Sequence, residues 1–207
     1  FYTGAGTDDD ESIRTIHRAI DLGVTLFDTA EAYGPYTNEE LLRRALGDRR
    51  DQVVIATKFG LYRHEAGEET PTQQRGISSA PESVREALEG SLRRLGTDHI
   101  DLYYAHRDVA DVPLEETLDA FDELVRAGKV RYLGASNYSA ERLAEALSIS
   151  DREGFARYVA LQPHYNLVER PVYEDELRDV VAGSGLGCFP YFALAKGFLT
   201  GKYRAGE

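Results

Sequence analysis

The sequence predicts an α/β fold, and within that class a (β/α)8 TIM barrel. Apolar runs of strand length alternate strictly with amphipathic segments of helix length, which is typical of parallel strands joined by helical crossovers. No strand runs into a Gly-x-Gly-x-x-Gly turn, which the competing architecture, a doubly wound nucleotide-binding sheet, should show after its first strand. Polar side chains lie at or just past the carboxyl ends of the strands, on the face where barrels carry their chemistry: Asp28, Lys58, His106, Asn137, Gln162 and Tyr191.

The apolar runs predict strands at residues 24–29, 53–58, 100–105, 130–136, 158–162 and 186–191. Segments with apolar residues on one face predict helices at residues 8–22, 38–46, 81–95, 113–127, 139–147 and 173–182. Asn38 and Ser139 are expected to cap two of these helices, and Pro81 stands in the first turn of another. The polar loop 59–80, rich in glycine and threonine, is expected to be mobile without ligand.

The chain is short for the predicted fold. A complete barrel takes about 250 residues, whereas this chain has 207, starts on a helix and stops after its sixth recognisable strand. We therefore expect a single domain over residues 1–207 that lacks the first strand and the last one or two β/α units. The absence of any methionine agrees with a chain that is part of a longer protein.

Composition narrows the range of functions. Hydrophobic residues make up 42% of the chain and charged residues 29%, as in a soluble globular domain. The net charge of −12 disfavours nucleic acid and anionic membrane surfaces as partners, and no apolar run is long enough to span a bilayer. Cys188 is the only cysteine, so an internal disulfide is ruled out, which favours a reducing, cytoplasmic location. Its place in an apolar strand predicts a buried inert thiol. No metal site is predicted, because the other histidines show no ligand spacing: His17, His64, His99 and His164.

Four of the polar residues can form a general-acid site for reducing a carbonyl group. A tyrosine is a poor acid at neutral pH, but a buried lysine lowers its pKa and a carboxylate compensates the lysine. Tyr33, Lys58 and Asp28 can form such a chain if their strands are neighbours, and His106 can hydrogen-bond the carbonyl. Each residue alone has a structural alternative: a snorkelling Lys58, a His106 paired with Asp108, or an Asp28 that caps its turn. The combination favours the site.

Seven motifs follow one another along the chain: Asp-Thr-Ala-Glu-Ala-Tyr-Gly (28–34), Ala-Thr-Lys (56–58), Leu-Tyr-Tyr-Ala-His (102–106), Gly-Ala-Ser-Asn (134–137), Leu-Gln (161–162), Pro-Tyr (190–191) and Gly-Phe-Leu-Thr-Gly-Lys-Tyr (197–203). In content and order they resemble the aldo-keto reductase family. The first is similar to that family's signature around its aspartate and catalytic tyrosine, and the next two to the segments that end in its lysine and histidine. The remaining motifs resemble segments that bind the nicotinamide and the pyrophosphate of the cofactor.

The resemblance implies hydride transfer from NADPH to an aldehyde or ketone, with Tyr33 as the proton donor. Lys58 and Asp28 would tune the tyrosine, and His106 would orient the carbonyl. It further implies cofactor contacts from Ser136, Asn137, Gln162, Tyr191, Phe192, Leu194, Lys196, Gly197, Leu199, Gly201 and Lys202. The aromatic residues Tyr33, Tyr36 and Phe59 are expected to line a mostly apolar substrate pocket.

Two departures from the family pattern bear on the cofactor. Ala193 stands where proline is usual, and Lys196 where a small residue is usual. Lys196 either contacts cofactor phosphate or marks a differently set cofactor loop. The family's site for the adenosine 2′-phosphate lies beyond Glu207, so the preference for NADP over NAD is inherited from the family.

Two other functions remain compatible with the sequence. A nicotinamide-binding, redox-sensing subunit of a larger assembly, like the β subunits of potassium channels, would keep all four catalytic residues but turn over little substrate. A truncated barrel that cannot hold cofactor is the other. The acidic charge and the lack of a partner motif favour a free enzyme that acts on a small-molecule carbonyl substrate, with its oligomeric state open.

Overall fold

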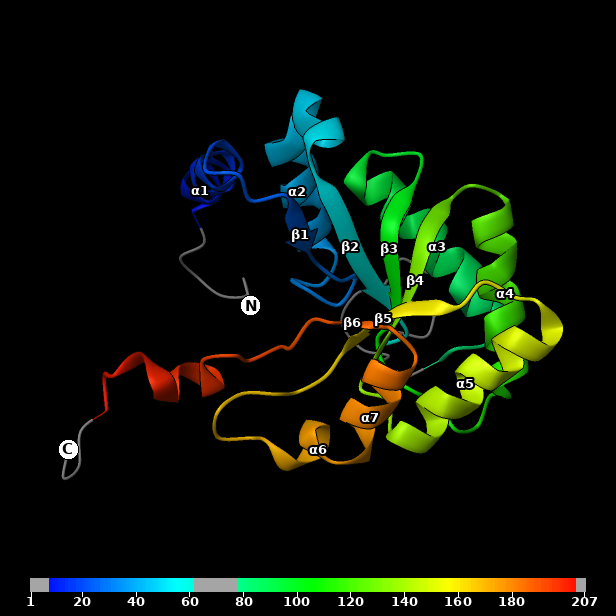
Figure 1. Ribbon diagram of the computed structural model, residues 1–207. Coiled ribbons are helices and arrows are strands. Elements are labelled where there is room, and N and C mark those ends of the chain that lie inside the picture. Colours follow the sequence, from blue (N-terminus) through cyan, green and yellow to red (C-terminus); the bar gives the residue numbers. More distant parts are fainter. Residues whose placement is uncertain (1–7, 62–77, 204–207) are drawn as a thin grey trace.

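The computed structural model describes residues 8–61 and 78–203. Within these ranges a six-stranded parallel sheet has the order β1-β2-β3-β4-β5-β6, so each strand lies beside its neighbours in sequence (Figure 1). A doubly wound sheet would reverse its strand order, whereas this order is that of a barrel open between its first and last strands. The incomplete (β/α)8 barrel is thereby confirmed. The strands are β1 (Leu26–Asp28), β2 (Val54–Phe59), β3 (Ile100–Ala105), β4 (Val130–Ser136), β5 (Tyr158–Gln162) and β6 (Gly187–Cys188).

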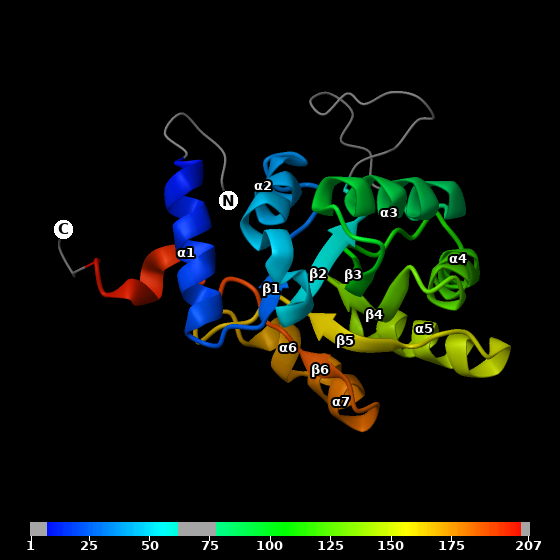
Figure 2. The ribbon, with the colours of Figure 1, turned by 90° about the horizontal axis from the view of Figure 1, so that it is seen from above.

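The helices follow one another around the outer face of the curved sheet (Figure 2). Parallel neighbours need a crossover, and at least one helix lies between each pair of consecutive strands in the chain. The helical elements are α1 (Asp9–Asp21), α2 (Thr37–Leu46), η1 (Gly47–Gln52), α3 (Pro81–Leu95), α4 (Leu114–Arg126), α5 (Ala140–Glu153), α6 (Pro171–Glu174), α7 (Glu176–Gly183) and η2 (Ala195–Thr200). No helix in the described ranges combines the length and the apolar character needed to cross a bilayer.

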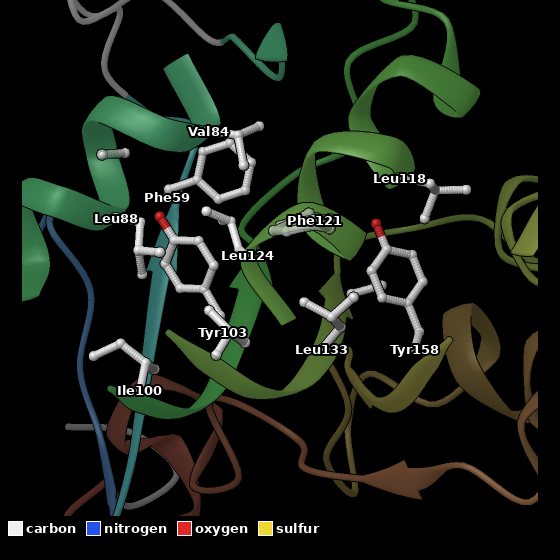
Figure 3. Packing of buried hydrophobic residues seen from close by; sticks show 14 of the residues in the cluster. Phe59, Val84, Leu88, Ile100, Tyr103, Leu118, Phe121, Leu124, Leu133 and Tyr158 are labelled. Atoms are coloured by element: carbon white, nitrogen blue, oxygen red, sulfur yellow. The ribbon is translucent and has the colours of Figure 1, made fainter. Parts of the chain in front are cut away.

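The main core lies between the sheet and its outer helices. A chain of aromatic rings runs through it, from Phe59 over Tyr103 and Phe121 to Tyr158, with ring centroids 5.4 to 6.1 Å apart (Figure 3). Burying one such ring contributes about 1.5–3 kcal/mol, so this layer stabilises the packing of the helices against the sheet. The core therefore fixes the strands from outside and leaves the inner face for the site.

Residues on β2 alternate between the two faces of the sheet. Ile55 and Phe59 pack outward in the main core, whereas Ala56 packs inward in a second small cluster with Leu102 and Tyr104. This alternation places Thr57 on the outer face and Lys58 on the inner face. The expectation that Phe59 lines a substrate pocket is wrong, because its ring belongs to the outer core.

One glycine allows the inner cluster to form. A Cβ atom added at Gly134 on β4 would come within 2.4 Å of the Tyr104 ring on the neighbouring strand. Such a contact is closer than any real Cβ atom tolerates, so the ring of Tyr104 requires glycine opposite it. Gly134 thus lets β3 and β4 pair while a large aromatic side chain lies between them on the inner face.

Several element boundaries differ from the expected ones. The helix predicted at 139–147 continues to Glu153, where Gly154 ends it in a left-handed conformation. The segment 173–182 forms two helices, because the backbone at Asp175 departs from helical geometry. The strand predicted at 186–191 is reduced to β6 and an isolated bridge between His164 and Tyr191. Pro163 lacks an amide hydrogen, so one position of the ladder is missing, although the Tyr191 amide still donates to the Pro163 carbonyl at 3.0 Å.

Two local predictions fail for reasons of tertiary contact. Asn38 does not cap α2, because the helix begins after Tyr36 and has no side-chain cap. The amide oxygen of Asn38 instead accepts from the Thr29 hydroxyl at 2.7 Å. Cys188 is partly rather than fully buried. Ser139 does cap α5, as predicted, by accepting from the Arg142 amide. Most of the loop predicted to be mobile, residues 62–77, lies outside the described residues.

Candidate active site

The ends of β1 and β2 bring three predicted residues together. The Lys58 ammonium donates to the Asp28 carboxylate at 2.5 Å and to the Thr29 carbonyl at 2.7 Å. Its third hydrogen points toward the Tyr33 hydroxyl, 3.5 Å away. The predicted contact between Lys58 and Asp28, with Tyr33 close by, is confirmed. All three hydrogens of a buried ammonium are used, which is what makes its burial tolerable.

Burial and charge set the ionisation of these groups. Burial lowers the pKa of Lys58, whose side chain is 0% exposed, and the charge of Asp28 opposes that effect. Burial, then the charge of Asp28 and the nearby Tyr191, raise the pKa of Tyr33 to about 12. The sequence-based expectation of a lowered tyrosine pKa is therefore wrong. Asp28 already balances the charge of Lys58, so Tyr33 stays protonated throughout the neutral range.

His106 follows β3 and faces Tyr33. The two rings lie edge to face with centroids 6.2 Å apart, and the His106 amide donates to the Phe59 carbonyl at 2.9 Å. Burial, helped by the charges of Lys58 and Arg107, lowers the pKa of His106 to about 3. The imidazole is therefore neutral. Its Nδ1 atom is buried and has no hydrogen-bond partner among the described residues.

The alternative in which His106 pairs with Asp108 is excluded, because Asp108 pairs with a different residue. That carboxylate accepts two hydrogen bonds of 2.9 Å from the Arg142 guanidinium on α5. A bidentate pair of this kind holds the chain after β3 in place without using the imidazole. Among the described residues, the His106 imidazole is therefore not paired with Asp108.

Four residues predicted to bind cofactor meet near the ends of β4 and β5: Ser136, Asn137, Gln162 and Tyr191. Ser136 donates to the Gln162 carbonyl at 2.9 Å, and the Asn137 amide nitrogen donates to the His106 carbonyl at 2.9 Å. The Tyr191 hydroxyl donates to the Asn137 amide oxygen at 2.6 Å. The amide nitrogen of Gln162 donates to Asp28. The amide groups of Asn137 and Gln162 therefore join the ends of β4 and β5 to His106 and Asp28.

An aromatic platform adjoins these amides. The His164 and Tyr191 rings stack with centroids 5.1 Å apart and an angle of 11° between their planes, and Phe192 lies edge-on to both. His164 was not predicted as a site residue. The signal for it is weak in the sequence, because its partner Tyr191 is far along the chain and the bridge between them is isolated.

The remaining predicted cofactor residues do not join this cluster. The chain after Phe192 runs away from the sheet (Figure 1), and Leu194, Lys196 and Lys202 are exposed along it. The Lys196 ammonium lies 5.3 Å from the centre of the Phe192 ring. The structure leaves the following predicted residues outside the cluster: Leu194, Lys196, Gly197, Leu199, Gly201 and Lys202.

Two buried carboxylates near the site were missed in the sequence. Glu31 lies inside the motif 28–34 and accepts from the Gly60 amide at 2.9 Å. Glu39 accepts from Thr57 and Arg94 behind β2. The position of Glu31 between Asp28 and Tyr33 is a signal that sequence reading could have used. The pairing of Glu39 joins segments far apart in the chain and leaves no local pattern.

A sequence model described as the Aldo/keto reductase family matches residues 2–207 of the chain. The chain belongs to this family. Among curated aldo-keto reductases, it is 36% identical over 203 residues to the L-glyceraldehyde 3-phosphate reductase of Escherichia coli, covering 95% of this chain and 56% of that protein. It is 37% identical over 199 residues to an aldo-keto reductase of Bacillus subtilis, with the same two coverages of 95% and 56%.

Solved structures of aldo-keto reductases have the same fold. A glycerol dehydrogenase from Gluconobacter oxydans superposes with a TM-score of 0.84 at 35% identity, covering 98% of this chain and 60% of that one. The holo form of an aldo-keto reductase from Bacillus halodurans gives 0.83 at 31% identity, covering 98% and 64%. The chain thus spans little more than half the length of the relatives it matches.

Proposed function

We propose that this aldo-keto reductase chain reduces an aldehyde or ketone to an alcohol with a nicotinamide cofactor, NADPH. The observation that carries the proposal is the chain of hydrogen bonds from Asp28 through Lys58 to Tyr33, beside a neutral His106. These groups lie at the carboxyl ends of neighbouring strands, where barrel enzymes carry their chemistry. The relatives named as a glyceraldehyde phosphate reductase and a glycerol dehydrogenase support a small, polar carbonyl substrate.

The residues at the ends of β4 and β5 fit a nicotinamide. Ser136, Asn137 and Gln162 offer hydroxyl and amide groups of the kind that pair with a carboxamide, and Tyr191 offers a ring face that is already stacked on His164. When bound, the nicotinamide supplies the hydride that the carbonyl carbon accepts. The choice of NADP over NAD follows from the family resemblance alone.

The proton comes from the protein in this proposal. As negative charge develops on the carbonyl oxygen, Tyr33 transfers its hydroxyl proton to that oxygen and the product alcohol forms. The Lys58 ammonium, 3.5 Å from the tyrosine oxygen, stabilises the phenolate left behind. His106, kept neutral by burial, donates an N–H hydrogen bond to the carbonyl and orients it. A tyrosine with a pKa of about 12 is fully protonated at neutral pH, so the donor is always loaded.

Removing the Tyr33 hydroxyl tests the proposal. Tyr33→Phe should slow NADPH oxidation with a reactive aldehyde by about 10²–10⁴, the usual cost of losing a general acid. NADPH binding, followed by the fluorescence of the reduced nicotinamide, should stay nearly unchanged because the hydroxyl is proposed to act on the substrate oxygen and not on the cofactor. Tyr132→Phe is the matched control, since this exposed tyrosine lies in the amino-terminal half of β4, whereas the site lies at the carboxyl ends of the strands.

Two outcomes would contradict the proposal. Reduction by Tyr33→Phe at the wild-type rate would remove the tyrosine as proton donor. Tight NADPH binding by a wild-type chain that reduces no carbonyl would remove the enzyme altogether. No observation on the described residues favours the redox-sensing subunit, so the enzyme alone is proposed.

A further inference from the structure

Gln162 makes a contact that crosses the open barrel. Its amide nitrogen donates to the Asp28 carboxylate at 2.9 Å, although β1 and β5 are not neighbours in the sheet. The orientation of the amide follows from chemistry, because a carboxylate only accepts hydrogen bonds and the –NH₂ group must face it. Gln162 is 8% exposed and the Asp28 side chain is 35% exposed, so this hydrogen bond is partly shielded from water. The contact therefore joins β5 directly to the residues around Tyr33.

Asp28 is held from two sides. Lys58 on β2 binds one carboxylate oxygen and Gln162 on β5 binds the other. The Asp28 side chain is 35% exposed, so without a second partner its free oxygen would be open to water and the group could turn. With both oxygens engaged, the plane of the carboxylate is fixed and one oxygen stays on the Lys58 ammonium.

We propose that Gln162 is a positioning residue for the proton donor, because it holds Asp28 so that Lys58 stays directed at Tyr33. This role is separate from contact with the nicotinamide, which the family resemblance assigns to the same side chain. It rests on the proposed function only in naming Tyr33 as the donor. The hydrogen bond to Asp28 uses one N–H of the amide, so the second N–H and the amide oxygen of Gln162 are left for a ligand.

The ionisation of Lys58 reports on this arrangement without cofactor or turnover. The ammonium faces Asp28 and Tyr33 at the end of β1, His106 after β3, and the charge of Glu39 on α2. The Asp28 carboxylate is the strongest of the influences that raise the pKa of Lys58. If Asp28 turns away, that support is weakened and the pKa of Lys58 falls further.

The titration of Lys58 should be followed by NMR of ¹³C-labelled lysine in the whole 207-residue chain. Gln162→Met, which keeps the length of the side chain, should move the Lys58 midpoint to lower pH. Asn137→Ala is the matched control: it removes the neighbouring amide, which has no contact with Asp28, and should leave the midpoint unchanged. Should Gln162→Met fail to fold, Gln162→Asn keeps an amide that is too short to reach Asp28 and should act in the same direction.

Kinetics provide a second readout. Gln162→Met should lower kcat when it is made in the wild-type chain, but it should cause no further loss of kcat when it is added to Asp28→Asn. Any loss of cofactor affinity that Gln162→Met causes should be the same in these two backgrounds. An unchanged Lys58 midpoint in the Gln162 variants would overturn the positioning role even in an active enzyme. A shifted midpoint in a chain that reduces no carbonyl would keep the role and overturn the proposed function.

Discussion

Thr57 and Lys58 are adjacent on β2, yet they belong to two different polar networks on opposite faces of the sheet. On the outer face, the Thr57 hydroxyl donates to Glu39 at 2.7 Å and Arg94 donates to the same carboxylate at 2.6 Å. The Arg94 guanidinium in turn lies 4.3 Å from the centre of the Tyr36 ring. On the inner face, Lys58 binds Asp28 and approaches Tyr33.

The two networks differ in how completely they are closed. Glu39 is 0% exposed and Arg94 15% exposed, and both oxygens of Glu39 have protein partners. The inner network is open at its far end: the Asp28 side chain is 35% exposed, and the buried Nδ1 of His106 has no partner in the described part of the chain. A closed network holds the fold, whereas an open one keeps polar groups available to a ligand, at a cost in stability.

The largest expected effect is on the outer network. Glu39→Ala leaves Arg94 buried without its carboxylate and Thr57 without its acceptor, so it should lower the free energy of unfolding by about 3–5 kcal/mol. Urea denaturation followed by circular dichroism measures the loss. Glu40→Ala is the control, because Glu40 is exposed on the same helix. Equal stability of the two variants would mean that the outer network does not hold the fold.

A smaller effect is expected at the open edge of the inner network. The Tyr191 hydroxyl donates to the Asn137 amide oxygen at 2.6 Å, so a cofactor amide that bound this oxygen would have to share it with the hydroxyl or displace the hydroxyl. Tyr191→Phe keeps the ring stacked on His164 but frees this acceptor, and should tighten NADPH binding about fivefold, the equivalent of one hydrogen bond near 1 kcal/mol. Fluorescence titration measures the change. Weaker binding would show that the hydroxyl itself contacts the cofactor.

The smallest effect concerns a third polar cluster, at the amino-terminal end of β3. Burial opposes ionisation of Asp101, but the Ile55 amide together with Arg50 and Arg131 outweighs it and lowers the pKa of Asp101. A depressed pKa contributes stability above the unfolded value of about 3.9, and that stability is lost as the pH falls through the folded value.

The corresponding test compares the wild type with Asp101→Asn. Their difference in unfolding free energy should be constant near neutral pH and narrow as the pH falls below about 4. Urea denaturation at several pH values measures it. A difference that widens in acid would mean that the Ile55 amide, Arg50 and Arg131 do not hold Asp101 as a carboxylate.

The sequence carried more information about the inner network than about the outer one. The strands β3, β4 and β5 match their predicted bounds because each is a continuous apolar run, and Asp28, Lys58 and His106 could be placed because each ends or follows such a run. The outer network pairs Glu39 with Thr57 and Arg94, which lie 18 and 55 positions away in the chain. No local sequence pattern indicates that these elements pack together.

Of three features that were predicted wrongly, one could have been read from the sequence and two depend on tertiary contacts. The outward direction of Phe59 follows from the alternation along β2 and could have been read from its place next to Lys58. The reduction of the last strand could not, because it depends on Pro163, which lacks an amide hydrogen, pairing with a segment far along the chain, around Tyr191. The raised pKa of Tyr33 depends on the balance between Asp28 and Lys58, which only distances decide.

The two networks are tested most directly through Thr57 and Lys58, the adjacent residues on β2. Thr57→Val and Lys58→Met each remove one polar group from one network and keep the size of the side chain. Aldehyde reduction by NADPH and urea denaturation should be measured on the same preparations. We expect Thr57→Val to lower the free energy of unfolding by about 1–3 kcal/mol, the cost of leaving a buried acceptor unpaired, with turnover retained. Lys58→Met should lose turnover by about 10²–10⁴ and remain folded. Loss of turnover in Thr57→Val with activity retained in Lys58→Met would contradict the account.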